Sequence, residues 1–136
     1  MSTRSEILIK EQGVYEGKKW KRELKLYHHS DGYPEGVGKF LMEHVYSMLM
    51  SSNPSVDDIT NYLIKNKEDD TFEITSGKHV DIEYFYEVNI TKKQIKCWSA
   101  HYNYEWDSDK PARLVKRKEC NLMRWAVKDK VEVSYA

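Results

Sequence analysis

Residues 27–39 of this chain, YHHSDGYPEGVGK, concentrate the residue types that constrain a backbone. They include three of the six glycines, one of the three prolines and two of the five histidines. The pairs Asp31-Gly32 and Tyr33-Pro34 are strong turn signals, so the chain is expected to bend here. A strand pattern precedes the bend and a helix pattern follows it, and the rest of the fold is predicted outward from this junction.

Two strands are expected before the turn. The run Ile-Leu-Ile within residues 5–11 is typical of a first strand. Residues 18–29 have the alternation of a second strand, and Gly13 and Gly17 bracket the turn between them. The two segments are therefore predicted to form a hairpin, which delivers the two histidines to the C-terminal end of its second strand.

Two helices are expected after the turn. From Val37 to about Ser51, apolar residues recur at helical spacing and charged residues fall on the opposite side. Asn53 is a favoured N-cap, and Pro54 is tolerated in a first helical position. A second, shorter helix is therefore predicted to end at about Lys65.

The remainder of the chain is predicted to form mainly strands. Residues 71–75 are a candidate strand, and residues 79–90 carry apolar or aromatic side chains at even-numbered positions. Residues 94–104 alternate in the same way and are expected to complete a long hairpin. Residues 105–111 are acidic and irregular, whereas residues 131–135 alternate again and predict a last strand. The pattern predicts an α+β fold, with two helices packed on one face of an antiparallel sheet.

The composition is that of an ordinary folded chain. Its 136 residues suffice for a single domain, predicted to span residues 1–136. Hydrophobic residues make up 40% and charged residues 32%, which argues against general disorder. Cys97 and Cys120 stand far apart with no Cys-x-x-Cys pair, so two reduced thiols are expected, and neither a metal site nor a cofactor is predicted.

The charge balance and the hydropathy narrow the expected partners. Basic and acidic residues balance at 22 each, so nucleic acid is not expected as a partner, although a local basic patch stays possible. No apolar run approaches the ~20 residues that span a bilayer. Residues 1–10 also lack the long apolar segment of a signal peptide. A cytoplasmic protein without membrane contact is therefore expected.

The start of the first helix is the first candidate site. A helix N-terminus presents unpaired backbone N–H groups, and glycines let a ligand approach them closely. Gly36 and Gly38 are therefore suited to cradle an anion such as a phosphate, and Lys39 would add positive charge. The spacing matches neither a P-loop nor a dinucleotide fingerprint. The alternative is that Gly32 and Gly36 only occupy turn positions.

His28 and Asp31 are the second candidate. Adjacent strand residues point to opposite faces, so only one of His28 and His29 can face the turn, and His28 is favoured because a bend at Ser30 would bring Asp31 beside it. A histidine beside a carboxylate can bind a ligand or act as a general acid or base. The alternative is a hydrogen bond that only holds the turn.

The predicted hairpin over residues 79–104 is rich in aromatic side chains, which could stack a base, meet a partner protein or simply form a core. The basic run of residues 113–118 could contact phosphates, but nearby acidic residues indicate a mixed, solvated surface. Aromatic residues are enriched at interface cores, so a homo-oligomer is also possible. The aromatic residues concerned are Tyr84, Tyr86, Trp98 and Tyr102.

Two motifs near the N-terminus occur together. The chain begins MSTR, and residues 28–38 read HHSDGYPEGVG. This combination resembles a set of small phage and prophage proteins, which typically begin Met-Gly/Ser-Thr-Arg and carry His-Trp-Asp-Gly-Tyr-Pro with following glycines directly before a helix. The resemblance covers about the first third of the chain, and Ser30 stands where those proteins commonly have an aromatic residue. That family largely lacks an assigned activity.

The resemblance implies a host-takeover or counter-defence factor acting in the host cytoplasm. It also suggests that Arg4, entering the first strand, lies near the Asp31 turn, where it would bind an anion or only pair with Asp31. The leading hypothesis is a phage-type binding protein for an anionic small molecule, with a nucleotide as the first candidate. Sequestration of a host signalling nucleotide is one role that this would allow. The expected ligand-binding residues are Arg4, His28, Asp31, Gly32, Tyr33, Gly36, Gly38 and Lys39.

Two alternatives stay open at this point. One is an inhibitor of a host protein, with a purely structural turn and an interface at the aromatic hairpin or the acidic segment 105–109. The other is a small hydrolase or phosphodiesterase that uses His28 with Asp31. No motif demands turnover, so no catalytic residue is assigned.

Overall fold

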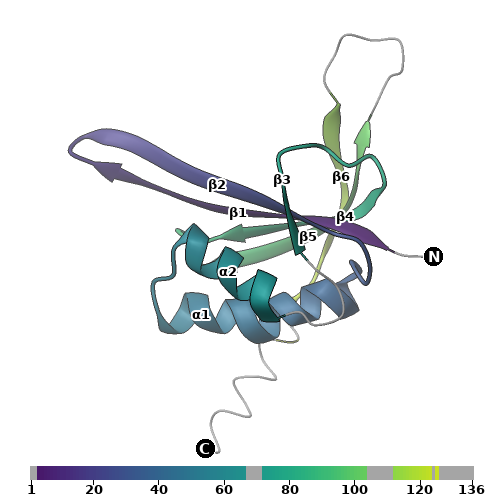
Figure 1. Cartoon of the computed structure of the whole chain (residues 1–136), viewed down its shortest axis with the longest axis horizontal. Helices are drawn as coiled ribbons and strands as arrows, with labels where there is room; N and C mark the ends of the chain where they lie inside the picture. The colour runs from purple at the N-terminus through teal and green to yellow at the C-terminus, as the bar shows by residue number, and fades with distance from the viewer. Residues whose placement is uncertain (1–2, 67–71, 104–111, 124, 126–136) are drawn as a thin grey trace, which may run out of the picture.

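The structure is a computed structural model that describes residues 3–66, 72–103, 112–123 and 125. It contains a six-stranded sheet with helices on one side (Figure 1), so the predicted α+β class is confirmed. The strands are β1 (Arg4–Tyr15), β2 (Lys18–His28), β3 (Phe72–Thr75), β4 (Ile82–Asn89), β5 (Gln94–Asn103) and β6 (Arg113–Cys120). The helices are α1 (Tyr46–Ser51), which continues two π-helical segments, Pro34–Gly38 and Leu41–Val45, and α2 (Val56–Asn66).

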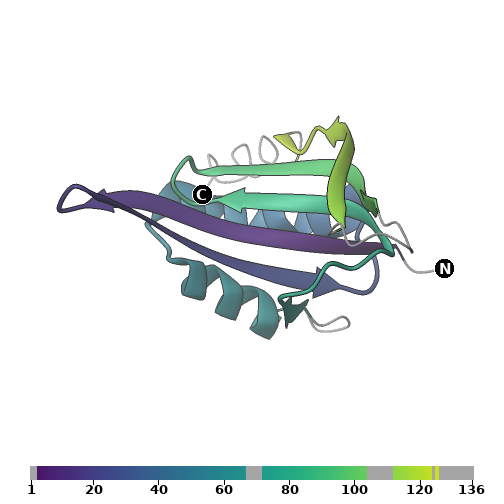
Figure 2. The same cartoon turned by 90° about the horizontal axis from the view of Figure 1, so that it is seen from above.

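The sheet is mixed rather than purely antiparallel. Its strand order is β3-β2-β1-β4-β5-β6 (Figure 2), and every neighbouring pair is antiparallel except β1 and β4, which are parallel. Because β3 and β4 both run in the direction of β1, no tight turn can join them. Residues 76–81 instead cross β2 and β1 before β4 begins at Ile82, later than the predicted start at His79.

Apolar packing closes the helical side of the sheet. Ile7 and Ile9 of β1 and Leu26 of β2 face the helices and are buried. The helical stretch of residues 34–51 covers them with one apolar face, which confirms the predicted amphipathic helix. The fully buried helical side chains include Val37, Leu41, Val45, Leu49, Ile59 and Leu63.

The opposite face of the sheet, called the open face below, carries a second apolar cluster. Its buried members are Tyr27, Ile82, Phe85, Ala100 and Tyr102, with Leu8, Trp98, Ala112 and Leu114 packed against them. Both faces of β4 are therefore covered, and this accounts for the buried apolar and aromatic residues that occur on both faces of that strand.

Because of a bulge in β4, its side chains do not all lie on the faces of the sheet that the sequence predicted. β1 pairs with Ile82 and then with Tyr84, so Glu83 is an extra residue. The bulge turns Ile82 to the open face, whereas Tyr84 packs on the helical side. Trp98 and Tyr102 lie on the open face. The aromatic side chains predicted to gather on the β4–β5 hairpin are thus divided between two faces.

Both helices start at other residues than predicted. The first helical stretch begins at Pro34 and not at the predicted Val37, because the chain already forms a tight turn before Val37. The second is capped by Ser55 instead of Asn53: Ser55 Oγ accepts from the Asp58 N–H at 3.1 Å, and Asp58 Oδ2 accepts from the Ser55 N–H at 2.9 Å. This reciprocal pair satisfies donors that a helix start leaves open.

Two of the sequence predictions concern residues that the structure does not describe. The predicted last strand, residues 131–135, and the acidic segment 105–111 lie outside the described residues. The basic run 113–118 lies in the edge strand β6. None of the helices in the described ranges is long and apolar enough to cross a membrane.

Candidate functional site

The turn between β2 and the first helix is closed by its own hydrogen bonds. Asp31 has a left-handed backbone with φ 53°, and its carbonyl accepts from the Val37 N–H at 2.8 Å. The Tyr33 carbonyl accepts from the Gly36 N–H at 2.9 Å, and the Tyr33 hydroxyl donates to Asp31 Oδ1 at 3.0 Å. The Gly36 N–H, which was expected to face an anion, and the neighbouring Val37 N–H are therefore both used within the turn.

The three glycines of the turn are required by close packing. A Cβ on Gly36 would lie 2.2 Å from the Asp31 carbonyl oxygen, and one on Gly32 would lie 2.8 Å from Ser5 Cβ. A Cβ on Gly38 would come within 2.9 Å of Leu122. The turn is also tied to the sheet, because the Tyr86 hydroxyl donates to the Gly32 carbonyl at 2.6 Å. These contacts explain the presence of the three glycines, and no bound ligand is needed for that explanation.

The other expected ligand-binding side chains point elsewhere. His28 is 0% exposed, with its ring 4.4 Å from that of Phe72 between centroids, so a ligand in solvent cannot reach it. Lys39 Nζ contacts Glu43 at 3.7 Å along the helix. Arg4 Nε pairs with Asp81 Oδ2 at 3.2 Å, whereas it was expected near the Asp31 turn, either binding an anion or pairing with Asp31. The structure thus keeps Asp31, Gly32, Tyr33, Gly36 and Gly38 together in the turn. The side chains of Arg4, His28 and Lys39 are engaged by Asp81, Phe72 and Glu43 instead.

A buried carboxylate lies under the open face of the sheet. Glu6 is 0% exposed and accepts from the Tyr102 hydroxyl at 2.5 Å and from the His79 backbone N–H at 3.0 Å. Lys25 Nζ lies 3.5 Å from the same carboxylate. Burial, and after it the hydrogen bond to Glu6, raises the pKa of Tyr102. A buried charge is tolerated only when it is paired and hydrogen-bonded in this way.

A second polar group lies beside it and involves Arg4. The Tyr27 hydroxyl donates to the Asp81 carboxylate at 2.9 Å, and Asp81 pairs with Arg4. The His79 ring stacks on Tyr27 with centroids 3.8 Å apart. Burial, reinforced by the bond to Asp81, raises the pKa of Tyr27 from 10.0 to about 12. The polar group around Glu6 and the polar group around Tyr27 and Asp81 both hold the crossing segment 76–81 against β1 and β2.

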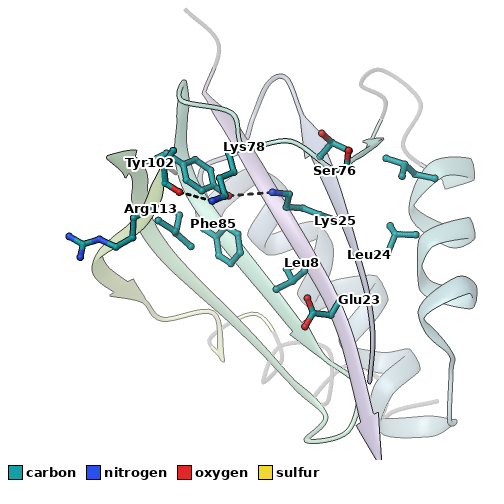
Figure 3. A pocket seen from close by; sticks show the side chains of 13 residues that line it. Leu8, Glu23, Leu24, Lys25, Ser76, Lys78, Phe85, Tyr102 and Arg113 are labelled. Atoms are coloured by element: carbon teal, nitrogen blue, oxygen red, sulfur yellow. Dashed lines mark hydrogen bonds between the residues drawn. The ribbon is translucent and has the colours of Figure 1, made fainter. Parts of the chain in front are cut away.

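A groove of about 830 Å³ opens between this segment, β2, β3 and the start of β6 (Figure 3). Its basic side chains are Lys25, Lys78 and Arg113, and Glu23 is the one acidic residue in its lining. Lys78 Nζ donates to the Ala112 carbonyl at 2.6 Å, so this lysine spans the groove. The apolar and aromatic part of the lining includes Leu8, Leu24, Ile74, Phe85, Tyr102 and Leu114.

The groove was missed by sequence reasoning because its lining comes from all six strands. Two signals were present. Glu6 directly precedes the apolar run Ile7-Leu8-Ile9 of the same strand, and Lys25 stands between Leu24 and Leu26. In a strand buried on both faces, such a charged residue needs a partner from another strand.

The chemistry available at the groove is recognition of an anion beside an apolar body. Lysine and arginine side chains suit phosphate and carboxylate groups. Within the described part of the chain, no three His, Cys, Asp or Glu side chains gather to hold a metal ion. No protein family, curated protein or solved structure matched this chain, so the functional argument depends on the geometry.

Replacing Gly36 by alanine is expected to destabilise the protein by about 2–3 kcal/mol, because the new methyl group meets a backbone oxygen that cannot move aside. Gly77→Ala is the matched control, because its Cβ would meet only Thr75 Oγ1 at 3.8 Å. Urea denaturation followed by circular dichroism measures both. Equal midpoints for the two variants would contradict the packing role of Gly36.

Replacing Glu6 by leucine is expected to cost about 3–5 kcal/mol of unfolding free energy, because it leaves the Lys25 ammonium without its counter-charge and the Tyr102 hydroxyl without its acceptor. The exposed Glu23→Leu serves as control and should change stability by less than about 1 kcal/mol. A triple variant that adds Lys25→Met and Tyr102→Phe should recover much of the loss. A stable single variant would show that the buried network contributes little.

The raised pKa of Tyr27 predicts a pH-dependent stability. Because the folded state holds this proton more tightly than the unfolded state, the contribution is complete below pH 10 and is lost as the pH rises towards about 12. By about pH 11 the loss amounts to about 1.4 kcal/mol. Tyr27→Phe lacks this proton, so the stability gap between wild type and variant should narrow above pH 10 in urea denaturation. A constant gap would rule out the shift.

Proposed function

We propose that this protein binds an anionic small molecule, with a nucleotide as the leading candidate, in the groove on the open face. The observation that carries the proposal is the lining of the groove, where three basic side chains oppose a single carboxylate above an aromatic and aliphatic wall. The volume of about 830 Å³ lies within the range of small-molecule sites.

The charges of the groove favour an anion. Lys25 is largely neutralised by Glu6, so Lys78 and Arg113 supply the available positive charge. Figure 3 shows Lys25 reaching Tyr102, to whose hydroxyl its Nζ donates at 3.4 Å, and Arg113 at the outer rim. An arginine can hold a phosphate through two parallel hydrogen bonds, and Lys78 would add a point charge. Phe85 and Tyr102 are themselves buried, so they form the floor of the groove under the cations.

This proposal moves the site from the β2–helix turn to the open face. The turn contributes indirectly, because it is fastened to the central strands that carry the groove. Sequestration of a host signalling nucleotide, as part of counter-defence, remains a proposal that rests on the resemblance of the N-terminal third to phage proteins.

The two alternative functions have less support. A hydrolase built on His28 and Asp31 would need a reachable histidine, and His28 is fully buried. An inhibitor that docks through the β4–β5 aromatics would need them exposed on one surface, but they are divided between two faces, and Tyr86 and Tyr102 are buried.

The test is mass spectrometry of molecules released from the heat-denatured protein, followed by calorimetric titration with ATP and with a cyclic dinucleotide. Losing a charged hydrogen bond costs about 1.5–3 kcal/mol, so Lys78→Gln with Arg113→Gln should weaken binding at least ~10-fold. Lys96→Gln, at an exposed lysine on β5 outside the groove lining, should leave it unchanged.

A further variant separates the two locations. Asp31→Asn keeps a residue type that tolerates the left-handed backbone and removes the turn carboxylate. Unchanged affinity in Asp31→Asn together with weakened binding in the groove variant supports the open face. Loss of binding in Asp31→Asn alone would return the site to the turn, and no binding of any probe would argue against the function.

A further inference from the structure

The β1–β2 hairpin extends beyond the rest of the sheet as a two-stranded arm. β4 pairs with β1 only as far as Lys10, and β3 pairs with β2 only from Lys25 onwards. Figures 1 and 2 both show the hairpin reaching past its neighbours. Its base is anchored, because Arg22 Nη2 donates to Asp57 Oδ2 of α2 at 2.8 Å. The tip, residues 12–21, is called the arm tip below.

Positive charge is concentrated on this arm although the chain as a whole is neutral. Residues 12–22 contain four basic residues and one acidic residue, Glu16. Arg22 is occupied by Asp57, so Lys18, Lys19 and Lys21 are the cations of the arm tip, and all three are exposed. Lys21 lies 3.6 Å from Glu23 in a solvent-exposed pair, which contributes little.

Aromatic side chains accompany the lysines. Gly13, predicted to border the turn, lies instead within β1 opposite Trp20. A Cβ on Gly13 would come 2.8 Å from the Trp20 ring, so the indole lies against the bare backbone and is held on one side. Trp20 is still 40% exposed, and Tyr15 on the same side of the ribbon is 71% exposed. The arm tip therefore presents an ordered ring and a second ring beside it.

A groove adjoins the tryptophan. It has a volume of about 630 Å³ and is lined by Trp20, Lys19, Lys21, Gln12 and Thr91, among others. Thr91 is fixed there, because the Gln12 N–H donates to Thr91 Oγ1 at 2.8 Å and Thr91 Oγ1 donates to the Gln12 carbonyl at 2.9 Å. Among the cations of the arm tip, Lys18 pairs with Tyr15 and shares the side of the two rings, whereas Lys19 and Lys21 alternate to the opposite side of the ribbon.

We propose that the arm tip binds single-stranded nucleic acid. Exposed rings stack on unpaired bases, and neighbouring lysines neutralise phosphates. A duplex hides its bases from such a ring, so the combination favours a single strand. The sequence-based prediction against nucleic acid rested on the zero net charge of the whole chain. A neutral chain can still carry a local basic patch such as the arm tip. This site is separate from the open-face groove, so either proposal can fail alone.

The test is fluorescence anisotropy with a labelled oligothymidylate and a labelled oligouridylate of about 20 nucleotides, a length that exceeds the site of a single small binding domain. Binding should be micromolar at low salt. Trp20→Ala should weaken it at least ~10-fold, because stacking is worth about 1–3 kcal/mol per base. Trp20→Phe keeps a ring and should retain most of the affinity, which separates lost stacking from a loosened arm.

The lysines are tested through salt dependence. Each single-strand phosphate contact contributes about 0.7 to the slope of log affinity against log salt. Replacing Lys18, Lys19 and Lys21 together by glutamine should therefore reduce the slope by about 2. The matched control replaces three exposed lysines on other elements, Lys65, Lys96 and Lys118, and should leave the slope unchanged.

Three outcomes would overturn the proposal. One is no anisotropy change at low salt. Another is an equal loss in the control triple variant, which would indicate diffuse charge. The third is displacement of the oligonucleotide by polyglutamate as effectively as by unlabelled oligothymidylate, which would assign the arm tip to an acidic protein partner instead.

Discussion

The buried carboxylate of Glu6 is the constraint on which the open face depends. It lies on the central strand β1 and is held by a tyrosine from β5, a lysine from β2 and a backbone N–H from the crossing segment. Each of these groups would otherwise be left partly desolvated without a partner. Because several kcal/mol separate a complete network from a broken one, the network selects a single placement of the crossing segment.

With the crossing segment in that place, the two faces of the sheet are covered by different kinds of side chain. The helical side is closed by aliphatic packing, which tolerates small adjustments and excludes water. The open side combines an aromatic cluster with the polar groups around Glu6 and Tyr27, and it has a groove lined in part by residues of segment 76–81 and the start of β6. A ligand site on a rigid central sheet keeps its geometry better than one on a surface turn.

The β2–helix turn supports this arrangement from the other side. Its left-handed Asp31 and closely packed Gly32, Gly36 and Gly38 press the chain against β1, β4 and Leu122. The β1–β2 hairpin shows the opposite situation, because its outer half has no sheet neighbour and few interior contacts. Exposed lysines on such a ribbon also discourage edge-to-edge aggregation, so they suit an extended arm whether or not a partner is bound.

Local sequence determined much of this fold. The first hairpin, the amphipathic helix after the Asp31-Gly32 turn and the β4–β5 hairpin follow from periodicity and turn chemistry, which act between residues close in the chain. Tertiary structure decided which groups meet. Arg4 pairs with Asp81, a partner 77 positions away, and Glu6 pairs with Tyr102, 96 positions away. No periodicity encodes such distances, since they depend on the parallel pairing of β1 with β4 and on the bulge at Glu83. The sequence alone therefore located the turn, whereas only the assembled sheet placed the groove, because its lining is contributed by strands from both ends of the chain.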